Sequence, residues 1–105
     1  MIYLPTYILL SSLTPEGRKV IKERPDRIDK VNKEIEALGV KVVSQFMVLG
    51  PYDFVNIVEA PDNETIAHLS VELGSRGTIE IISMPAIPRD KFTTFLTPKR
   101  IPKIQ

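Results

Sequence analysis

The chain has 105 residues and carries 14 Lys and Arg against 13 Asp and Glu, which gives a net charge of +1. That length is typical of one domain with a single core, and so small a charge argues against nucleic acid as a partner, because phosphate binding needs a clear excess of basic residues. The lack of cysteine excludes disulfides, thiolate nucleophiles and sulfur-ligated metals. The start has no basic segment and no apolar run approaches about 20 residues, so we expect a cytoplasmic protein without membrane contact.

The first predicted elements are a strand over residues 6–12 and a helix after it. The helix start is marked by Thr-Pro-Glu at 14–16, which supplies an N-cap, a proline at the first helical position and an acid in the first turn. Pro25 disfavours helical geometry at Arg24, so we expect two helices or one kinked helix, ended by Gly39. Apolar residues at helical spacing mark the inner face: Val20, Ile21, Ile28, Val31, Ile35 and Leu38.

The middle of the chain predicts a hairpin followed by a helix and a last strand. The strand-like runs at 40–49 and 54–59 are too close together for a crossover helix, so they should pair antiparallel. Asp62 caps the next helix, which Gly74 and Gly77 end before a strand at 78–84. The inward stripe of that helix is Ile66, Leu69, Ser70 and Leu73.

The predicted order is strand, helix, strand, strand, helix, strand. This is the ferredoxin-like α+β arrangement, a four-stranded antiparallel sheet with both helices on one face. Pro88 opens a further short helix with an apolar patch of Phe92, Phe95 and Leu96. We place a single domain at residues 1–97 and a tail at 98–105.

Apolar residues occupy both faces of the predicted strands. Two helices shield one face only, and a large exposed apolar patch usually marks an interface. We therefore expect a homodimer in which two copies pack sheet against sheet around a two-fold axis, giving a closed, barrel-like interior that a larger even-numbered oligomer could extend. The alternative is that the last helix and the tail fold back over the sheet. The runs of adjacent apolar residues that place side chains on both faces are Ile8-Leu9-Leu10, Val42-Val43, Val48-Leu49 and Ile81-Ile82.

The hairpin turn Gly50-Pro51-Tyr52-Asp53, followed by Val-Glu-Ala-Pro-Asp at 58–62, resembles the GYD domain family of small bacterial and archaeal proteins. The resemblance extends from residue 6 to the short helix after residue 87. A G-x-Y-D hairpin is also similar to the effector-binding domain of leucine-responsive regulators, which carry a helix-turn-helix domain that we do not expect here. The resemblance implies a ferredoxin-like fold paired as a dimeric α/β barrel, and it implies no settled activity.

Four residues of the hairpin are candidate ligand contacts: Gly50, Tyr52, Asp53 and Asn56. Gly50 would let a ligand approach the backbone, and Tyr52 or Asp53 would hydrogen-bond it at the mouth of the barrel. Asn56 lies in mid-strand, where a buried amide needs partners. Structural roles are the alternative: Asp53 would accept hydrogen bonds from turn amides, Tyr52 would pack its ring, and Asn56 would belong to an internal network. Glu59 reads as a surface carboxylate.

No catalytic residue is predicted, and neither is a metal or a cofactor. His68 is the only histidine, and it shares the outer face of its helix with Glu64 and Glu72, an arrangement common on solvated helices. Acyl-transfer chemistry lacks a base, because no histidine is expected near the hydroxyls of Ser11, Ser12, Ser44 and Ser83.

Three functions are compatible with the sequence. A small-molecule binding or regulatory module, which the sequence favours, would hold its ligand between sheet and helices or at the subunit interface, in an apolar pocket with a few convergent polar groups. A cofactor-free enzyme of the isomerase or monooxygenase type would need a polar group with a perturbed ionisation inside a cavity. A structural oligomerisation protein would have a filled interior.

Overall fold

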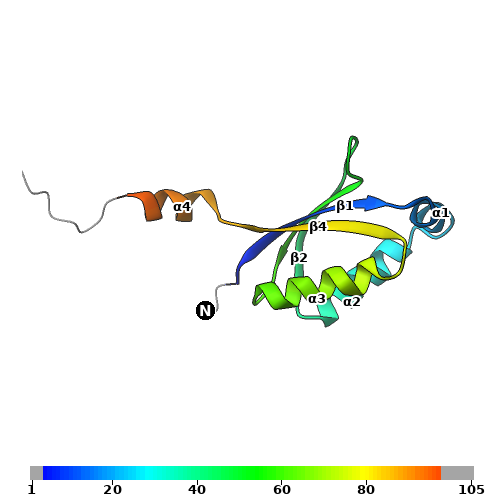
Figure 1. Ribbon diagram of the computed structural model, residues 1–105, viewed down its shortest axis with the longest axis horizontal. Helices are drawn as coiled ribbons and strands as arrows, with labels where there is room; N and C mark the ends of the chain where they lie inside the picture. The colour runs from blue at the N-terminus through cyan, green and yellow to red at the C-terminus, as the bar shows by residue number, and fades with distance from the viewer. Residues whose placement is uncertain (1–3, 98–105) are drawn as a thin grey trace, which may run out of the picture.

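The computed structural model describes residues 4–97 and shows a four-stranded sheet with helices on one face (Figure 1). The strands are antiparallel and lie in the order β2-β3-β1-β4. They comprise β1 (Thr6–Leu13), β2 (Lys41–Met47), β3 (Phe54–Glu59) and β4 (Ile79–Ala86). The helices are α1 (Pro15–Glu23), α2 (Arg27–Ala37), α3 (Asn63–Gly74) and α4 (Arg89–Leu96).

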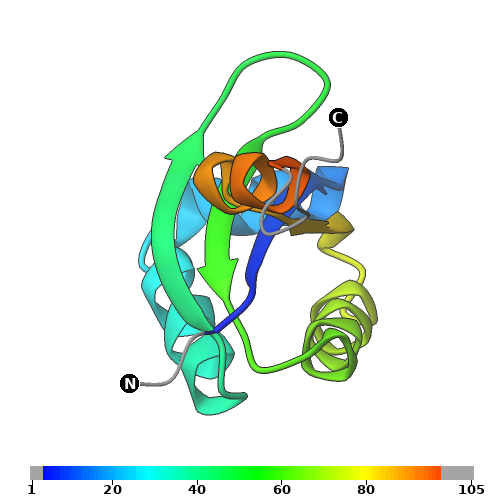
Figure 2. The same ribbon diagram turned by 90° about the vertical axis from the view of Figure 1, so that its left-hand side faces the viewer.

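The predicted ferredoxin-like α+β fold is confirmed. Helices α2 and α3 lie apart from each other on the same side of the sheet, and α1 lies at the far end of β1 (Figures 1 and 2). Helix α4 follows the end of β4 and stands clear of the other three helices (Figure 1). The predicted tail at 98–105 lies outside the described residues.

Local sequence signals set the helix ends. The Thr14 hydroxyl oxygen accepts a hydrogen bond from the Gly17 amide at 3.1 Å, which caps α1. The helix stops at Arg24, before Pro25, and the chain restarts as α2, so the two-helix alternative is the observed one. Gly39, with φ of +93°, turns the chain out of α2 in a conformation that suits glycine.

Asp62 begins α3. Its carboxylate accepts hydrogen bonds from the amide of Thr65 at 2.8 Å and from the hydroxyl of the same residue at 2.6 Å. These bonds, the hydroxyl first, lower the pKa of the Asp62 carboxyl and keep it charged at the positive end of the helix.

The core lies between the sheet and α2 and α3. Along β1 the burial alternates, so that Tyr7, Leu9 and Ser11 are buried while Ile8 and Leu10 face the other side of the sheet. The apolar cluster on the helix side consists of Tyr7, Leu9, Ile35, Val40, Val58, Ala60, Ile66, Leu69 and Leu73. The predicted inward residues of α3 are buried except Ser70, which is half-buried.

Two strand ends differ from the prediction by two residues each. Strand β2 ends at Met47 rather than at residue 49, because the Val48 amide already donates to the Asp53 carbonyl across the turn at 2.8 Å. Strand β4 continues to Ala86, since its last residues still pair with the start of β1, where Thr6 lies opposite Ala86. Among residues 4–97, no helix is long and apolar enough to cross a membrane.

Gly17 makes the closest contact between α1 and the start of β4. A Cβ at this position would overlap the Thr78 carbonyl oxygen and touch the Leu13 side chain. The same carbonyl accepts the Thr14 amide at 3.1 Å, so it cannot move away without breaking a hydrogen bond. We therefore expect Gly17→Ala to lower the free energy of unfolding by about 1–3 kcal/mol, although Ala favours helix.

Urea denaturation would measure the effect of Gly17→Ala. Gly74→Ala is the matched control, since a Cβ there meets nothing within 4 Å and the residue also lies in a helix. The control should unfold at the same urea concentration as the natural chain or higher. Equal midpoints for the two variants would contradict the predicted overlap.

Candidate functional site

A cavity of about 100 Å³ lies between the sheet and the first two helices. Its walls are mostly apolar, with Leu9, Phe54 and Ile81 contributed by the strands and Val31 and Ile35 by α2. Natural cores contain few voids larger than a water molecule. A space of this size has room for several waters or one small molecule.

Two polar oxygens in this cavity have no hydrogen-bond partner among residues 4–97. They are Ser11 Oγ on β1 and Asn56 Oδ1 on β3, both buried. Ser11 lies opposite Phe54 and Asn56 opposite Leu9, so the two side chains are diagonal neighbours on one face of the sheet. A buried polar group without a partner costs about 1–3 kcal/mol, and such groups in native proteins generally meet a water or a ligand.

A pair of amides beside the cavity explains why Asn56 Oδ1 is left over. Gln45 lies directly opposite Asn56 across the β2–β3 ladder. Its side chain instead bonds reciprocally with Asn32 of α2, donating at 3.1 Å and accepting at 3.0 Å. This exchange directs the Gln45 side chain toward α2 rather than toward its neighbour on β3.

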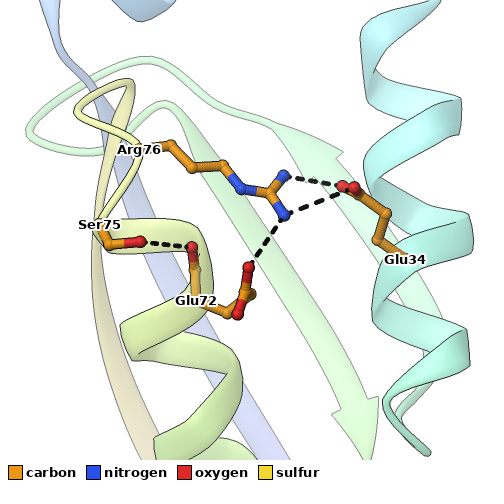
Figure 3. A network of polar contacts seen from close by, with 4 residues as sticks. All are labelled: Glu34, Glu72, Ser75 and Arg76. Carbon is orange, nitrogen blue, oxygen red and sulfur yellow. Dashed lines mark hydrogen bonds and ion pairs between the residues drawn. The ribbon is translucent and has the colours of Figure 1, made fainter.

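Arg76 connects the helices at the edge of the cavity (Figure 3). Its guanidinium donates to Glu34 of α2 at 2.8 Å and to Glu72 of α3 at 3.4 Å. The hydrogen bond from Arg76 lowers the pKa of Glu34, so this carboxyl is charged at neutral pH. Its contribution to stability is present above the unfolded-state pKa of a glutamate and is lost as the pH falls through the lowered value. This bridge fixes the spacing of α2 and α3 above the sheet.

The hairpin turn is held to the end of β1 by Asp53. Its carboxylate accepts a hydrogen bond from the Leu13 amide at 2.7 Å, and its own amide donates to the Ser11 carbonyl at 2.8 Å. The Ser12 hydroxyl donates to the Pro51 carbonyl at 3.3 Å. These hydrogen bonds join β1 to the turn beyond Ser11 and Phe54, the last pair of the β1–β3 ladder. They favour a role for Asp53 in holding the turn rather than in contacting a ligand.

Asn56 is the only one of the four candidate ligand contacts among the residues lining the cavity. Gly50 is exposed with φ of +125°, Tyr52 is half-buried, and neither of them nor Asp53 lines the cavity. The hairpin motif and the cavity are thus neighbouring features rather than one site. His68 is exposed on α3, and no cluster of metal-binding side chains occurs within residues 4–97.

Several residues of the cavity were not predicted from the sequence. Ser11 could have been predicted, because alternation with Tyr7 and Leu9 puts it on the buried face of β1, but it was considered only as a hydroxyl without a nearby base. Nothing in the sequence indicated the position of Arg76, since its partner Glu34 is 42 residues away along the chain.

The opposite face of the sheet is apolar and open. One row across the strands consists of Phe46, Val55, Leu10 and Ile82, and the next contains Ile57, Ile8 and Met84. Phe46 and Ile82 are 55% and 49% exposed. Polar residues border these rows: Lys41 lies opposite Glu59 at one end, and Ser12 opposite Glu80 at the other. An apolar centre with a polar rim is the anatomy of a protein interface.

Helix α4 presents a second apolar surface. All its residues are exposed, including Phe92, Phe95 and Leu96. Phe92 and Phe95 lie over an open hollow of about 720 Å³ that also includes Pro5 and Ile87. An amphipathic helix of this length gains most of its stability from packing, and its position off the sheet leaves that surface without cover from the rest of residues 4–97.

These features define a ferredoxin-like α+β domain with one helix-covered sheet face and one open apolar face. The chain belongs to the GYD domain family, which matches residues 7–96. Over 86 residues it is 49% identical to the glutamine synthetase and cystathionine beta-lyase binding protein of Thermus thermophilus, covering 81% of this chain and 90% of that protein.

The crystal structure of MtbAldR has the same fold. It superposes with a TM-score of 0.61 at 19% identity and covers 81% of this chain. The match takes in 52% of MtbAldR, so the chain spans about half the length of that protein.

The contacts of Asp53 predict a structural effect of its removal. We expect Asp53→Ala to lower the free energy of unfolding by about 1–3 kcal/mol, because the Leu13 amide would lose its acceptor. Asp53→Asn is the matched variant, since the amide oxygen can still accept, and it should retain most of the stability. Chemical denaturation of both variants would measure this. An unchanged midpoint for Asp53→Ala would show that the hydrogen bond contributes nothing to the fold.

Proposed function

We propose that this protein is an enzyme-binding regulatory protein that acts as a homodimer. The observation that carries the proposal is the 49% identity, over 90% of its length, to a relative named for binding glutamine synthetase and cystathionine beta-lyase. Identity at this level over nearly the whole domain favours a shared mode of action as well as a shared fold. Glutamine synthetase and cystathionine beta-lyase are therefore the first enzymes to test as partners.

The chemistry of the cavity supports a binding role over a catalytic one. Arg27 and Arg76 are the ionisable residues in its lining, which contains no Asp, Glu, His, Lys, Cys or Tyr. General acid–base catalysis needs a group that can gain or lose a proton near neutral pH, and an arginine stays protonated. The enzyme alternative therefore lacks a proton-transferring group in this cavity.

The open sheet face supports the homodimer. A second copy offers the same apolar rows and the same polar rim, which is the self-complementarity that a two-fold interface requires. Two such faces would pack as stacked sheets about 10 Å apart. Each face would then serve as the cover that the other lacks.

The position of α4 also supports a second copy as the cover. The alternative was that this helix folds back over its own sheet, yet it lies beyond the end of β4 in line with the strand (Figure 1). An arm in this position extends past its own subunit. In a two-fold dimer, Phe92 and Phe95 are available to pack against the partner.

The dimer predicts a specific response to charge at the sheet face. We expect the natural chain to be a dimer and Ile82→Lys to be a folded monomer, because the dimer would bury an unpaired ammonium at a cost of several kcal/mol. Val71→Lys is the matched control, since Val71 is 70% exposed on α3, away from this face. Light scattering during gel filtration would measure the masses. A natural chain that is monomeric at all concentrations, or an Ile82→Lys dimer, would contradict the proposed interface.

Enzyme binding is tested directly by immobilising the purified protein and passing over it glutamine synthetase or cystathionine beta-lyase from the same host. We expect saturable binding to at least one of them and a change in its catalytic rate at saturating protein. The control is the Val71→Lys dimer, which should bind as the natural chain does. Lack of binding to both enzymes by a confirmed dimer would refute enzyme binding without touching the dimer itself.

A further inference from the structure

We propose that the cavity between the sheet and the first two helices is a binding site for a small, mostly apolar molecule that carries no positive charge and has one N–H or O–H group. This goes beyond enzyme binding and does not depend on it. The proposal rests on three properties of the cavity: its size, the two buried oxygens in its wall, and the charges around it.

The size limits the ligand to about the dimensions of a five-membered ring. A cavity of 150 Å³ lined by apolar side chains binds benzene, and this one measures about 100 Å³. The apolar walls formed by Leu9, Phe54 and Ile81 favour a hydrocarbon or aromatic body. The ion pairs from Arg76 to Glu34 and Glu72 link α2 to the end of α3 at the edge of this space (Figure 3).

The two buried oxygens specify a hydrogen-bond donor on the ligand. Asn56 Oδ1 can only accept, so it requires an N–H or O–H from its partner. Ser11 Oγ can donate or accept, and Ser11 is only 2% exposed. Because the two side chains are diagonal neighbours on the same face of the sheet, a hydroxyl placed between them would donate to one and accept from the other.

The charges exclude a cationic ligand. No carboxylate lines the cavity, so a buried cation would have no counter-ion. The guanidinium of Arg76 is already paired with two glutamates. An uncharged donor therefore fits these walls better than an ammonium group does.

Pyrrole and furan are the probes that test this assignment, because they have nearly the same shape and only pyrrole carries an N–H. Each would be titrated into the full-length protein, with amide chemical shifts followed by NMR and no enzyme present. We expect saturable pyrrole binding that shifts the amides of Ser11 and Asn56. Pyrrole should bind roughly five- to tenfold more tightly than furan, the size of effect expected from one hydrogen bond.

Asn56→Leu should abolish the difference between the probes. Leucine has the same branching as asparagine with no polar atom, and although it is larger, replacing buried polar groups by apolar ones of similar shape can be nearly neutral for stability. We expect both probes to bind this variant with an affinity ratio near one. Ser11→Ala, a smaller change, should reduce the preference for pyrrole in the same direction and serves as the second variant if Asn56→Leu alters the fold.

Three results would overturn the assignment: no saturable binding of either probe, equal affinity of both for the natural chain, or an unchanged preference in both variants. If water–protein NOEs showed that water stays at Ser11 and Asn56 throughout the titration, the probes would not have entered the cavity, and this would also overturn the assignment. None of these results bears on enzyme binding, which is measured with different partners and variants.

Discussion

A four-stranded sheet has two faces, and the helices of this chain cover only one of them. The short connections after β1 and β3 bring α1, α2 and α3 to the same side, while β2 and β3 are joined directly by the hairpin. Leu10, Val55 and Ile82 are consequently left on a face that none of the helices within residues 4–97 reaches. Burial of apolar area is the main favourable term in folding and association. The proposed two-fold pairing follows from that constraint.

The covered face of the sheet differs, because it buries polar atoms that have no hydrogen-bond partner among residues 4–97. Asn56 and Ser11 lie among aliphatic side chains, and the amide closest to Asn56 along the ladder is engaged by Asn32. An aliphatic pair at these positions would fill the space at no desolvation cost. The proposed ligand would compensate the two oxygens, so that the cavity and its polar groups have one explanation. The open sheet face and α4 would then bind protein partners, and the cavity would bind a small molecule.

The hairpin motif illustrates how far residue identity can mislead about role. Gly50, Tyr52 and Asp53 carried the resemblance to the family that matches residues 7–96, and the sequence analysis also predicted them as ligand contacts. In the structure the Asp53 carboxylate holds the turn to Leu13, and the cavity is lined by Phe54 and Asn56 further along β3. The sequence could point to Asn56 because a mid-strand amide is unusual. Ser11 carried only the signal of strand alternation, and Asn32 gave none, since ordinary surface helices contain the same residue type.

The sequence by itself determined the elements and the faces of the strands. Thr14, Pro25 and Asp62 mark helix ends because capping and proline geometry act within about four residues. Alternation assigned Leu9 and Leu10 to opposite faces because the pleat has a period of two. Only the tertiary structure decided which polar groups meet, since this depends on strand register and helix position. The pairing of Gln45 with Asn32, the bridge from Arg76 to Glu34 and the diagonal placement of Ser11 and Asn56 all depend on distant parts of the chain, where no local rule applies.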